Sequence, residues 1–216
     1  MNILFDLDGT LTDSSEGITR SIQYALQELG RPVPAKEDLY PCIGPPLLAS
    51  FLDRLGIETE TEAEQAVTLY RKRYVKKGHI ENKVYDNVFA TLDELKQQGH
   101  TLFVATAKPY VQAVPILEHL KLASYFEKIY GSELNGRNQE KTDPIAAILK
   151  EQNLPPERTI MVGDRKYDMR GARKNKVLPI GVSYGFGSVE ELQESGAAFV
   201  AKDPLQISTI VKDIVN

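Results

Sequence analysis

The sequence has little cysteine, no excess of positive charge and no long apolar run. Cys42 is the single cysteine among 216 residues, which excludes an internal disulfide or a site built from several thiolates and favours a reducing compartment. Lysine and arginine total 26 against 30 acidic residues, so charge gives no reason to expect a nucleic acid partner. No run approaches the about 18 apolar residues of a membrane helix, and no charged-then-apolar leader precedes the first strand pattern. We therefore expect a cytoplasmic protein with no membrane association.

Strand and helix patterns alternate from Val84 to the end of the chain. Apolar segments predict strands at residues 101–105, near 129, and at 159–162, 178–182 and 198–200. Helical periodicity predicts helices at about 88–97, 111–120, 143–150 and 169–173, and from 204 onward. Strands this continuously apolar are typical of a parallel sheet that is covered by helices on both faces. The predicted fold class is therefore α/β, with a doubly wound parallel sheet.

Between these segments and the N-terminus lies a stretch with helical periodicity and no convincing strand. Its first helix is predicted at residues 18–29, with Asp13 and Glu16 resembling a capping box and Gly30 as the stop. Further apolar stripes predict helices at 47–55 and 63–74. We expect two domains, which are a helical cap of residues 14–82 and a core of residues 1–13 and 83–216.

Two aspartates follow the first apolar segment of the chain. In an extended chain, residues i and i+2 point the same way, so Asp6 and Asp8 would lie side by side. Leu7 would then turn into the core, and Gly9 would allow a sharp turn. Adjacent carboxylates repel unless a cation or a shared proton compensates, so the pair indicates a metal site or acid–base chemistry. The alternative is an exposed strand end with two solvated aspartates.

Polar residues also follow two other predicted strands. The carboxyl ends of parallel strands meet at one edge of a sheet, where ligands bind. Thr106 follows the strand at 101–105 and could hold a phosphate oxygen, or it could be an ordinary helix cap. The strand at 159–162 leads through Gly163 to Asp164 and Asp168, which could face one site or could form a cap and a salt-bridged turn.

A lysine opens one of the predicted helices. The helix dipole does not favour positive charge at that end, so Lys141 is a candidate for neutralising a phosphate and an aspartate together. Lys108 and Arg137 compete for this role, and we favour Lys141. The glycine-rich segment 184–187 is predicted to be a loop at the edge of the site, where Phe186 could stack on a base or, as we favour, have a packing role.

Taken in order, these segments resemble the four motifs of the haloacid dehalogenase-like (HAD) hydrolase superfamily. Phe5 to Ser14, FDLDGTLTDS, is similar to the first motif, and an apolar strand followed by Thr106 is similar to the second. Lys141, 23 residues before Asp164, resembles the third motif, and the GDRKYD segment from Gly163 resembles the fourth. Lys108-Pro109 is similar to the phosphoglycolate phosphatase and 5′-nucleotidase branch. The resemblance covers the whole chain, with residues 14–82 in the place of a helical cap.

The resemblance implies a set of catalytic and metal-binding residues. Asp6 would attack phosphorus and form an aspartyl phosphate, while Asp8 would protonate the leaving group and then activate water. Mg²⁺ would be the cofactor, held by Asp6, the backbone carbonyl of Asp8, and Asp164, with Asp168 orienting these ligands. Thr106 and Lys141 would hold the phosphoryl oxygens.

The resemblance also implies a function and further substrate contacts. Thr106, Ala107 and Lys108 would contact the substrate, and Gly44 belongs to a segment that is either a substrate-facing loop or a plain helix start. The implied function is a Mg²⁺-dependent phosphatase of small phosphorylated metabolites, similar to phosphoglycolate phosphatases and 5′-nucleotidases. The alternatives are a sugar phosphomutase of the same superfamily and a non-enzymatic phospho-accepting signalling domain. Asp8 disfavours a dehalogenase, because a halide leaves without a proton.

Overall fold

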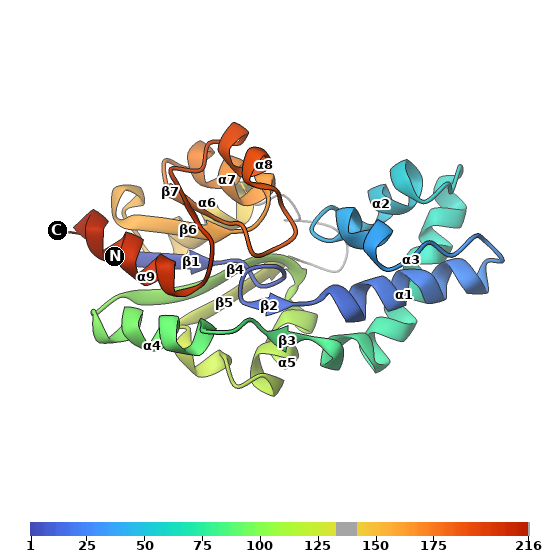
Figure 1. Ribbon diagram of the computed structural model, residues 1–216, viewed down its shortest axis with the longest axis horizontal. Coiled ribbons are helices and arrows are strands. Elements are labelled where there is room, and N and C mark those ends of the chain that lie inside the picture. Colours follow the sequence, from blue (N-terminus) through green and yellow to red (C-terminus); the bar gives the residue numbers. More distant parts are fainter. Residues whose placement is uncertain (133–141, 216) are drawn as a thin grey trace. The chain divides into compact units, whose positions relative to one another are not determined.

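The computed structural model describes residues 1–132 and 142–215, and the chain divides into two compact units (Figure 1). Met1–Asp13 and Val84–Asn216 form the first, called the core unit below, and Ser14–Lys83 form the second, called the helical unit. A short two-stranded sheet pairs β2 (Thr12–Asp13) with β3 (Lys83–Val84). Across the described residues, no helix combines the length and the apolar character needed to cross a membrane.

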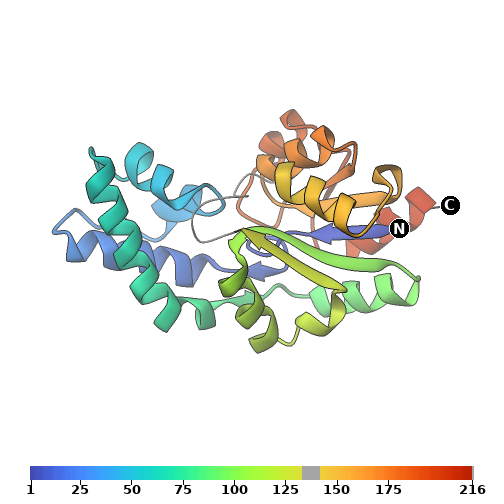
Figure 2. The same ribbon diagram turned by 180° about the vertical axis from the view of Figure 1, so that it is seen from behind.

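A parallel sheet forms the centre of the core unit. In the described part of the chain it has six strands in the order β5-β4-β1-β6-β7-β8. Their bounds are β1 (Asn2–Phe5), β4 (Thr101–Pro109), β5 (Lys128–Ser132), β6 (Thr159–Gly163), β7 (Leu178–Val182) and β8 (Phe199–Ala201). Leu4 of β1 lies between Phe103 of β4 and Met161 of β6, and all the pairings are parallel. Figure 2 shows β5 at the edge of the sheet beside β4. The predicted α/β fold with a parallel sheet is confirmed.

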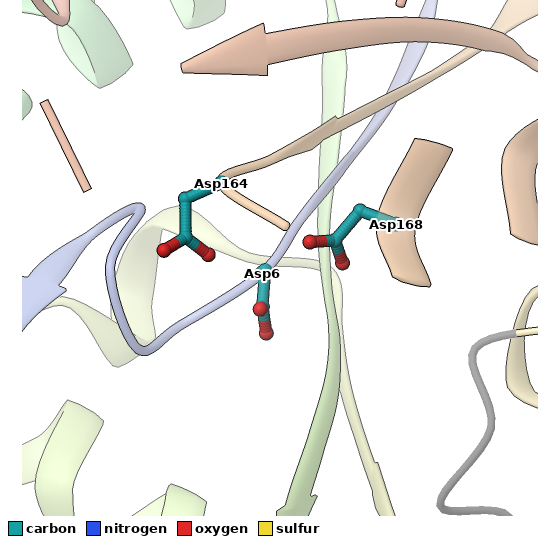
Figure 3. Close-up of side chains that lie close together, drawn as sticks. All are labelled: Asp6, Asp164 and Asp168. Atoms are coloured by element: carbon teal, nitrogen blue, oxygen red, sulfur yellow. The ribbon is translucent and has the colours of Figure 1, made fainter. Parts of the chain in front are cut away.

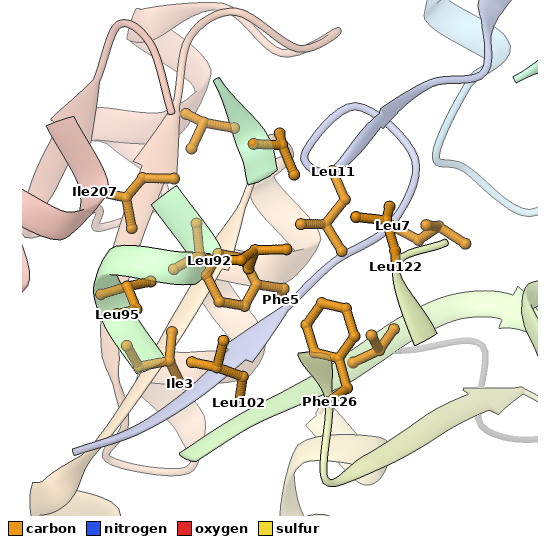
Figure 4. Close-up of a cluster of buried hydrophobic side chains, with 14 of the residues drawn as sticks. Ile3, Phe5, Leu7, Leu11, Leu92, Leu95, Leu102, Leu122, Phe126 and Ile207 are labelled. Carbon is orange, nitrogen blue, oxygen red and sulfur yellow. The ribbon is translucent and has the colours of Figure 1, made fainter. Parts of the chain in front are cut away.

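Apolar side chains of the strands alternate between the two faces of the sheet. Ile3 and Phe5 face a cluster that includes α4 (Val88–Gln97), α5 (Tyr110–His119) and α9 (Leu205–Val215) (Figure 4). Leu4 belongs to a second cluster, which includes α6 (Thr142–Glu151) and α7 (Lys166–Lys174). Both faces of the sheet are therefore buried, which explains why its strands are apolar at successive positions. The remaining helices of this unit are η3 (Ala123–Tyr125), η4 (Pro156–Arg158) and α8 (Val189–Glu194).

The helical unit packs around its first helix. Its elements are α1 (Ser15–Glu28), η1 (Glu37–Cys42), α2 (Leu47–Arg54), α3 (Glu60–Lys76) and η2 (Gly78–Glu81). A side chain at Gly17 of α1 would overlap the carbonyl oxygen of Gly78, so glycine there allows α1 to approach η2 closely. Arg73 at the end of α3 forms a partly buried ion pair with Glu81, at 2.9 Å.

Two local predictions were wrong, both because of pairing with distant residues. The predicted capping box placed the N-cap of the first helix at Asp13, whereas Asp13 belongs to β2 and the N-cap residue of α1 is Ser14. The strand predicted at 101–105 continues to Pro109, because Pro109 pairs with Ser132 of β5.

Candidate active site

Three aspartates gather where β1 and β6 end. Asp6 follows β1, Asp164 follows β6, and Asp168 lies in the first turn of α7. Figure 3 shows the three side chains converging, and one carboxylate oxygen from each lies within 4.8 Å of the others. All three residues are buried. They meet because β1 and β6 are adjacent parallel strands, so their carboxyl ends lie at the same edge of the sheet.

Each of these carboxylates accepts a hydrogen bond from a backbone N–H. The N–H of Leu7 donates to Asp6 Oδ1 at 2.7 Å, and that of Phe186 donates to Asp164 Oδ2 at 2.8 Å. The N–H of Arg165 donates to Asp168 Oδ2 at 3.0 Å. Because backbone donors are fixed by the fold, the orientation of all three carboxylates is set without relying on mobile side chains.

Two glycines permit this close packing. A side chain at Gly163 would overlap the Asp168 carboxyl group. Gly9 has a φ of 81°, a conformation that favours glycine, and a side chain there would overlap Asp164 Oδ2. Gly9 in the loop after β1 and Gly163 at the end of β6 are therefore required by the contacts of the carboxylates themselves.

Asp164 is the most buried of the three carboxyl groups, and little positive charge surrounds it. Asp164 has no exposed surface, and its burial, together with the charges of Asp168 and Asp6, holds its pKa well above the usual range for aspartate. The hydrogen bond from Phe186 and the charge of Arg165 lower that pKa only in part. Asp164 Oδ1 is buried without a hydrogen-bond partner among residues 1–132 and 142–215. A hard cation that binds oxygen ligands would satisfy this oxygen and offset the repulsion, so the residues present fit a metal ion.

Asp8 lies apart from this acidic group. Its Oδ2 forms an ion pair with Lys108 Nζ at 2.7 Å, and the three-carboxylate group found in the described residues does not include it. Leu7 between the two aspartates is fully buried, as the alternation of an extended chain predicts. The turn after Asp8 is tight, because the N–H groups of Leu11 and Thr12 both donate to the carbonyl oxygen of Leu7. Any part that Asp8 plays in metal binding through its backbone carbonyl stays a prediction.

The other predicted site residues have different surroundings. Thr106 is buried, and its hydroxyl oxygen accepts a hydrogen bond from the Lys108 N–H at 3.2 Å. Ala107 is partly exposed, and its carbonyl oxygen accepts one from the Ser132 hydroxyl at 2.8 Å. Gly44 belongs to the helical unit, where it has a φ of 100°. Lys141 and Arg137 lie outside the described residues.

The segment 184–187 contributes more to the site than the sequence suggests. The Phe186 N–H binds Asp164, and the Tyr184 hydroxyl donates to the carbonyl oxygen of Thr10 at 3.0 Å. Burial raises the pKa of Tyr184, so its hydroxyl remains a hydrogen-bond donor. A side chain at Gly185 would lie 2.7 Å from Asp164 Oδ2 and would overlap the carbonyl oxygen of Gly9. The glycines on either side of Phe186 were the signal in the sequence for this backbone contact, and the packing role predicted for the Phe186 side chain stays a prediction.

Several named proteins are similar to this chain over most of its length. A protein of Pseudomonas aeruginosa named 5′-nucleotidase is 48% identical over 192 residues, which cover 89% of this chain and 86% of that protein. The tyrosine-protein kinase PtkA of Mycobacterium tuberculosis is 35% identical over 198 residues, covering 92% of this chain and 67% of that protein. A phosphoglycolate phosphatase of Pseudomonas savastanoi is 32% identical over 210 residues, covering 93% and 76%.

A solved structure and a family model agree with these relatives. The crystal structure of a predicted phosphatase from Clostridium acetobutylicum superposes with a TM-score of 0.93 and 44% sequence identity, and the match covers 98% of both chains. The model of the haloacid dehalogenase-like hydrolases matches residues 3–182, which begin in β1 and end with β7. That range contains Asp6, Asp164 and Asp168 and all the strands that position them. The parallel sheet, the acidic group at its edge and this match lead to one conclusion: the chain belongs to the haloacid dehalogenase-like hydrolase family.

Proposed function

We propose that the protein is a Mg²⁺-dependent phosphatase of small phosphorylated metabolites that acts through an aspartyl phosphate on Asp6. The chain is a phosphoric monoester hydrolase by its family and its phosphatase relatives. The proposal of a Mg²⁺-dependent reaction through Asp6 rests on the group of three buried carboxylates. In this group the predicted nucleophile, Asp6, lies within reach of the same cation as Asp164 and Asp168.

Asp6 has the surroundings of an oriented nucleophile. A carboxylate attacks phosphorus without first losing a proton at neutral pH, so it needs orientation more than activation. The Leu7 N–H fixes one of its oxygens, and β1 holds its backbone between β4 and β6. In the first step the carboxylate would form a bond to phosphorus as the bond to the leaving oxygen breaks. Water would then hydrolyse the aspartyl phosphate.

The charge that develops on phosphorus needs partners from several strand ends. Mg²⁺ suits Asp6, Asp164 and Asp168, because it takes oxygen ligands and is usually held by a few carboxylates; when bound, it neutralises phosphoryl oxygens and the acidic group together. Thr106 lies within β4, the strand next to β1, and its hydroxyl can donate to a phosphoryl oxygen while accepting from Lys108. Lys141 remains our candidate for a positive charge from the third motif.

Asp8 would exchange protons with the leaving group and with water. It would give a proton to the departing alkoxide and later take one from the attacking water. A halide leaving group would need no such proton, so an acid at this position supports phosphate ester chemistry.

The helical unit is the proposed cap, which would choose among substrates and exclude water from the core unit. 5′-Nucleotides and 2-phosphoglycolate are the first candidates, because relatives carry the names 5′-nucleotidase and phosphoglycolate phosphatase. A reducing cytoplasm is the proposed compartment, since the single cysteine is buried and free.

Phosphate release from a panel of metabolites tests the proposal. The purified protein should hydrolyse at least one phosphomonoester with Mg²⁺ and none with a chelator. Asp6→Asn should lower kcat by at least about a thousandfold while the thermal unfolding profile is kept, because the amide cannot form the acyl phosphate. Asp213→Asn on the exposed face of α9 is the matched control and should keep full activity.

The product distinguishes the alternatives. Transfer of the phosphoryl group to a second sugar hydroxyl would indicate a phosphomutase, and transfer to tyrosine would align this chain with the relative named as a tyrosine-protein kinase. Phosphatase activity that survives Asp6→Asn would refute the nucleophile assignment.

A further inference from the structure

Lys108 is a buried lysine whose position is determined by the sheet. Only 5% of its side chain is exposed, and its ammonium group lies 2.7 Å from Asp8 Oδ2. Burying a lysine is costly unless a partner compensates its charge, and Asp8 supplies that partner. The contact joins residues that are 100 positions apart in the sequence, across the adjacent strands β1 and β4.

The backbone around Lys108 is held by an irregularity of β4. Ala105 pairs with Tyr130, and Pro109 pairs with Ser132, so β4 advances four residues while β5 advances two. Such a bulge changes the direction of the side chains in the longer strand. Hydrogen bonds brace it: the Ser132 hydroxyl donates to the Ala107 carbonyl, and the Lys108 N–H donates to the Thr106 hydroxyl.

A glycine of β5 makes room for the bulge. A side chain at Gly131 would lie 2.7 Å from the carbonyl oxygen of Lys108 and equally close to the backbone nitrogen of Tyr110. Distances this short do not occur for a real side chain, so any other residue at Gly131 would push the segment 106–110 away from β5. The local sequence of both strands therefore fixes where Lys108 lies.

The two carboxylate oxygens of Asp8 have different surroundings. Oδ2 is engaged by Lys108, whereas Oδ1 is buried and has no hydrogen-bond partner in the described residues. A carboxylate held by one oxygen cannot rotate freely, so the second oxygen keeps a defined position. The group formed by Asp6, Asp164 and Asp168 in the described residues does not include the Asp8 side chain.

We propose that Lys108 is a positioning residue for Asp8 and not the phosphate ligand that the sequence predicts. This inference rests on the proposed function, in which Asp8 exchanges protons. By holding Oδ2, Lys108 presents Oδ1 for both transfers. Asp8 enters the first step protonated on Oδ1, and the leaving oxygen takes this proton as its bond to phosphorus breaks, which leaves the carboxylate that pairs with Lys108. In the second step, Oδ1 takes a proton from the water that forms a bond to phosphorus and displaces the Asp6 carboxylate.

A comparison of leaving groups separates positioning from phosphate binding. p-Nitrophenolate leaves as a stable anion and needs no proton, whereas 2-phosphoglycolate and AMP release alkoxides that do. We expect Lys108→Met to lower kcat/KM for these alkyl esters by at least about tenfold, within the usual range for acid–base catalysis, and to change kcat/KM for p-nitrophenyl phosphate by less than about threefold. KM should not rise for either kind of substrate, and for p-nitrophenyl phosphate KM and kcat should fall together when hydrolysis of the aspartyl phosphate limits turnover.

The second step gives a separate signature. If Asp8 is misplaced, hydrolysis of the aspartyl phosphate slows, so rapid mixing of Lys108→Met with p-nitrophenyl phosphate should give a burst of up to one nitrophenolate per active site. Asp8→Asn should show the same pattern. The double variant should match Asp8→Asn within about twofold, because residues that act through one group are not additive.

Two further variants control for folding and charge. Lys128→Met removes an exposed lysine of β5 that forms an ion pair with Glu151, and it should leave both substrates unaffected. Lys108→Arg keeps a positive donor and should recover part of the activity on alkyl esters, which a loss of folding would not allow.

The results that overturn the inference differ from those that overturn the proposed function. An equal rise in KM for both kinds of substrate in Lys108→Met would make Lys108 a phosphate ligand. If kcat/KM fell selectively for alkyl esters in Asp8→Asn but not in Lys108→Met, the positioning role of Lys108 would be refuted. The proton transfer assigned to Asp8 would then still stand. An equal loss for both kinds of substrate in Asp8→Asn, measured as kcat/KM, would refute the proton transfer assigned to Asp8 and this inference with it.

Discussion

Mg²⁺ should stabilise the folded protein, and the effect should grow with pH. The pKa of Asp164 is raised by burial and by the charges of Asp168 and Asp6. A carboxyl group whose pKa is higher in the folded state stabilises the fold fully below its unfolded pKa, about 3.9 for aspartate, and this stabilisation is lost as the pH rises through the folded value. The metal-free protein should therefore become less stable over that window. Mg²⁺ binds the deprotonated carboxylates, so its stabilising effect should increase over the same window.

Linkage gives the size of the effect. A ligand that binds only the folded state adds about 2.7 kcal/mol to the free energy of unfolding when its concentration is 100 times its Kd. Each kcal/mol raises Tm by about 2–4 °C in proteins of about 150–250 residues, and this chain has 216. We therefore expect saturating Mg²⁺ to raise Tm by about 5–11 °C at about pH 8 and by clearly less at about pH 5.

The assay is thermal unfolding followed by circular dichroism, with Mg²⁺ or with a chelator. Asp164→Asn keeps an oxygen that accepts from the Phe186 N–H but removes the buried charge. This variant should be more stable than the wild type without metal at neutral pH and should lose most of the response to Mg²⁺. Asp213→Asn should behave as the wild type, since Asp213 is exposed. A Mg²⁺ response that is independent of pH, or that survives Asp164→Asn, would contradict this electrostatic account.

Three further substitutions test the supports of the site. Gly185→Ala should weaken Mg²⁺ binding about 10–100-fold, measured by titration calorimetry, because the added carbon displaces the Phe186 N–H from Asp164. An unchanged Mg²⁺ affinity would show that the segment 184–187 can move without affecting the metal ligands. Ser132→Ala should lower the free energy of unfolding by about 1 kcal/mol, and it should reduce kcat/KM for alkyl esters more than for p-nitrophenyl phosphate if the bulge positions Lys108. Leu92→Ala in the core should cost about 2–5 kcal/mol in denaturant unfolding while Mg²⁺ affinity stays the same.

Segments whose structure depends on local pattern were predictable. The helix expected at 88–97 and the strand expected at 178–182 have the observed bounds, because a continuous apolar stripe or run determines each of them. The helix α8 was missed: it has only six residues, which is too short for helical periodicity to appear. Asp13 was misjudged because its backbone pairs with β3, some seventy residues further along the chain.

Side-chain partners across the sheet were harder to predict. Spacing placed Asp6, Asp164 and Asp168 at strand ends, and the order of the strands decided that they meet. The pairing of Asp8 with Lys108 depends on the bulge of β4, which arises from contacts with β5 and has no local signature in the sequence. A lysine two residues after a threonine that follows an apolar run is compatible with binding either phosphate or a carboxylate, and only the path of the backbone distinguishes the two.

Backbone donors explain why this acidic group can exist before a cation binds. Each of the three carboxylates accepts a backbone N–H, from Leu7, Phe186 or Arg165, and each donor comes from a different loop at the edge of the sheet. These hydrogen bonds orient the oxygens but do not neutralise the carboxylates, and burial together with the charges of Asp168 and Asp6 raises the pKa of Asp164. An arginine or lysine directed at the cluster would remove the repulsion and would also compete with a cation for the same oxygens. Holding the carboxylates with neutral amides keeps the site ordered and still attractive to a divalent ion, whereas the positive charge of Lys108 is paired with Asp8.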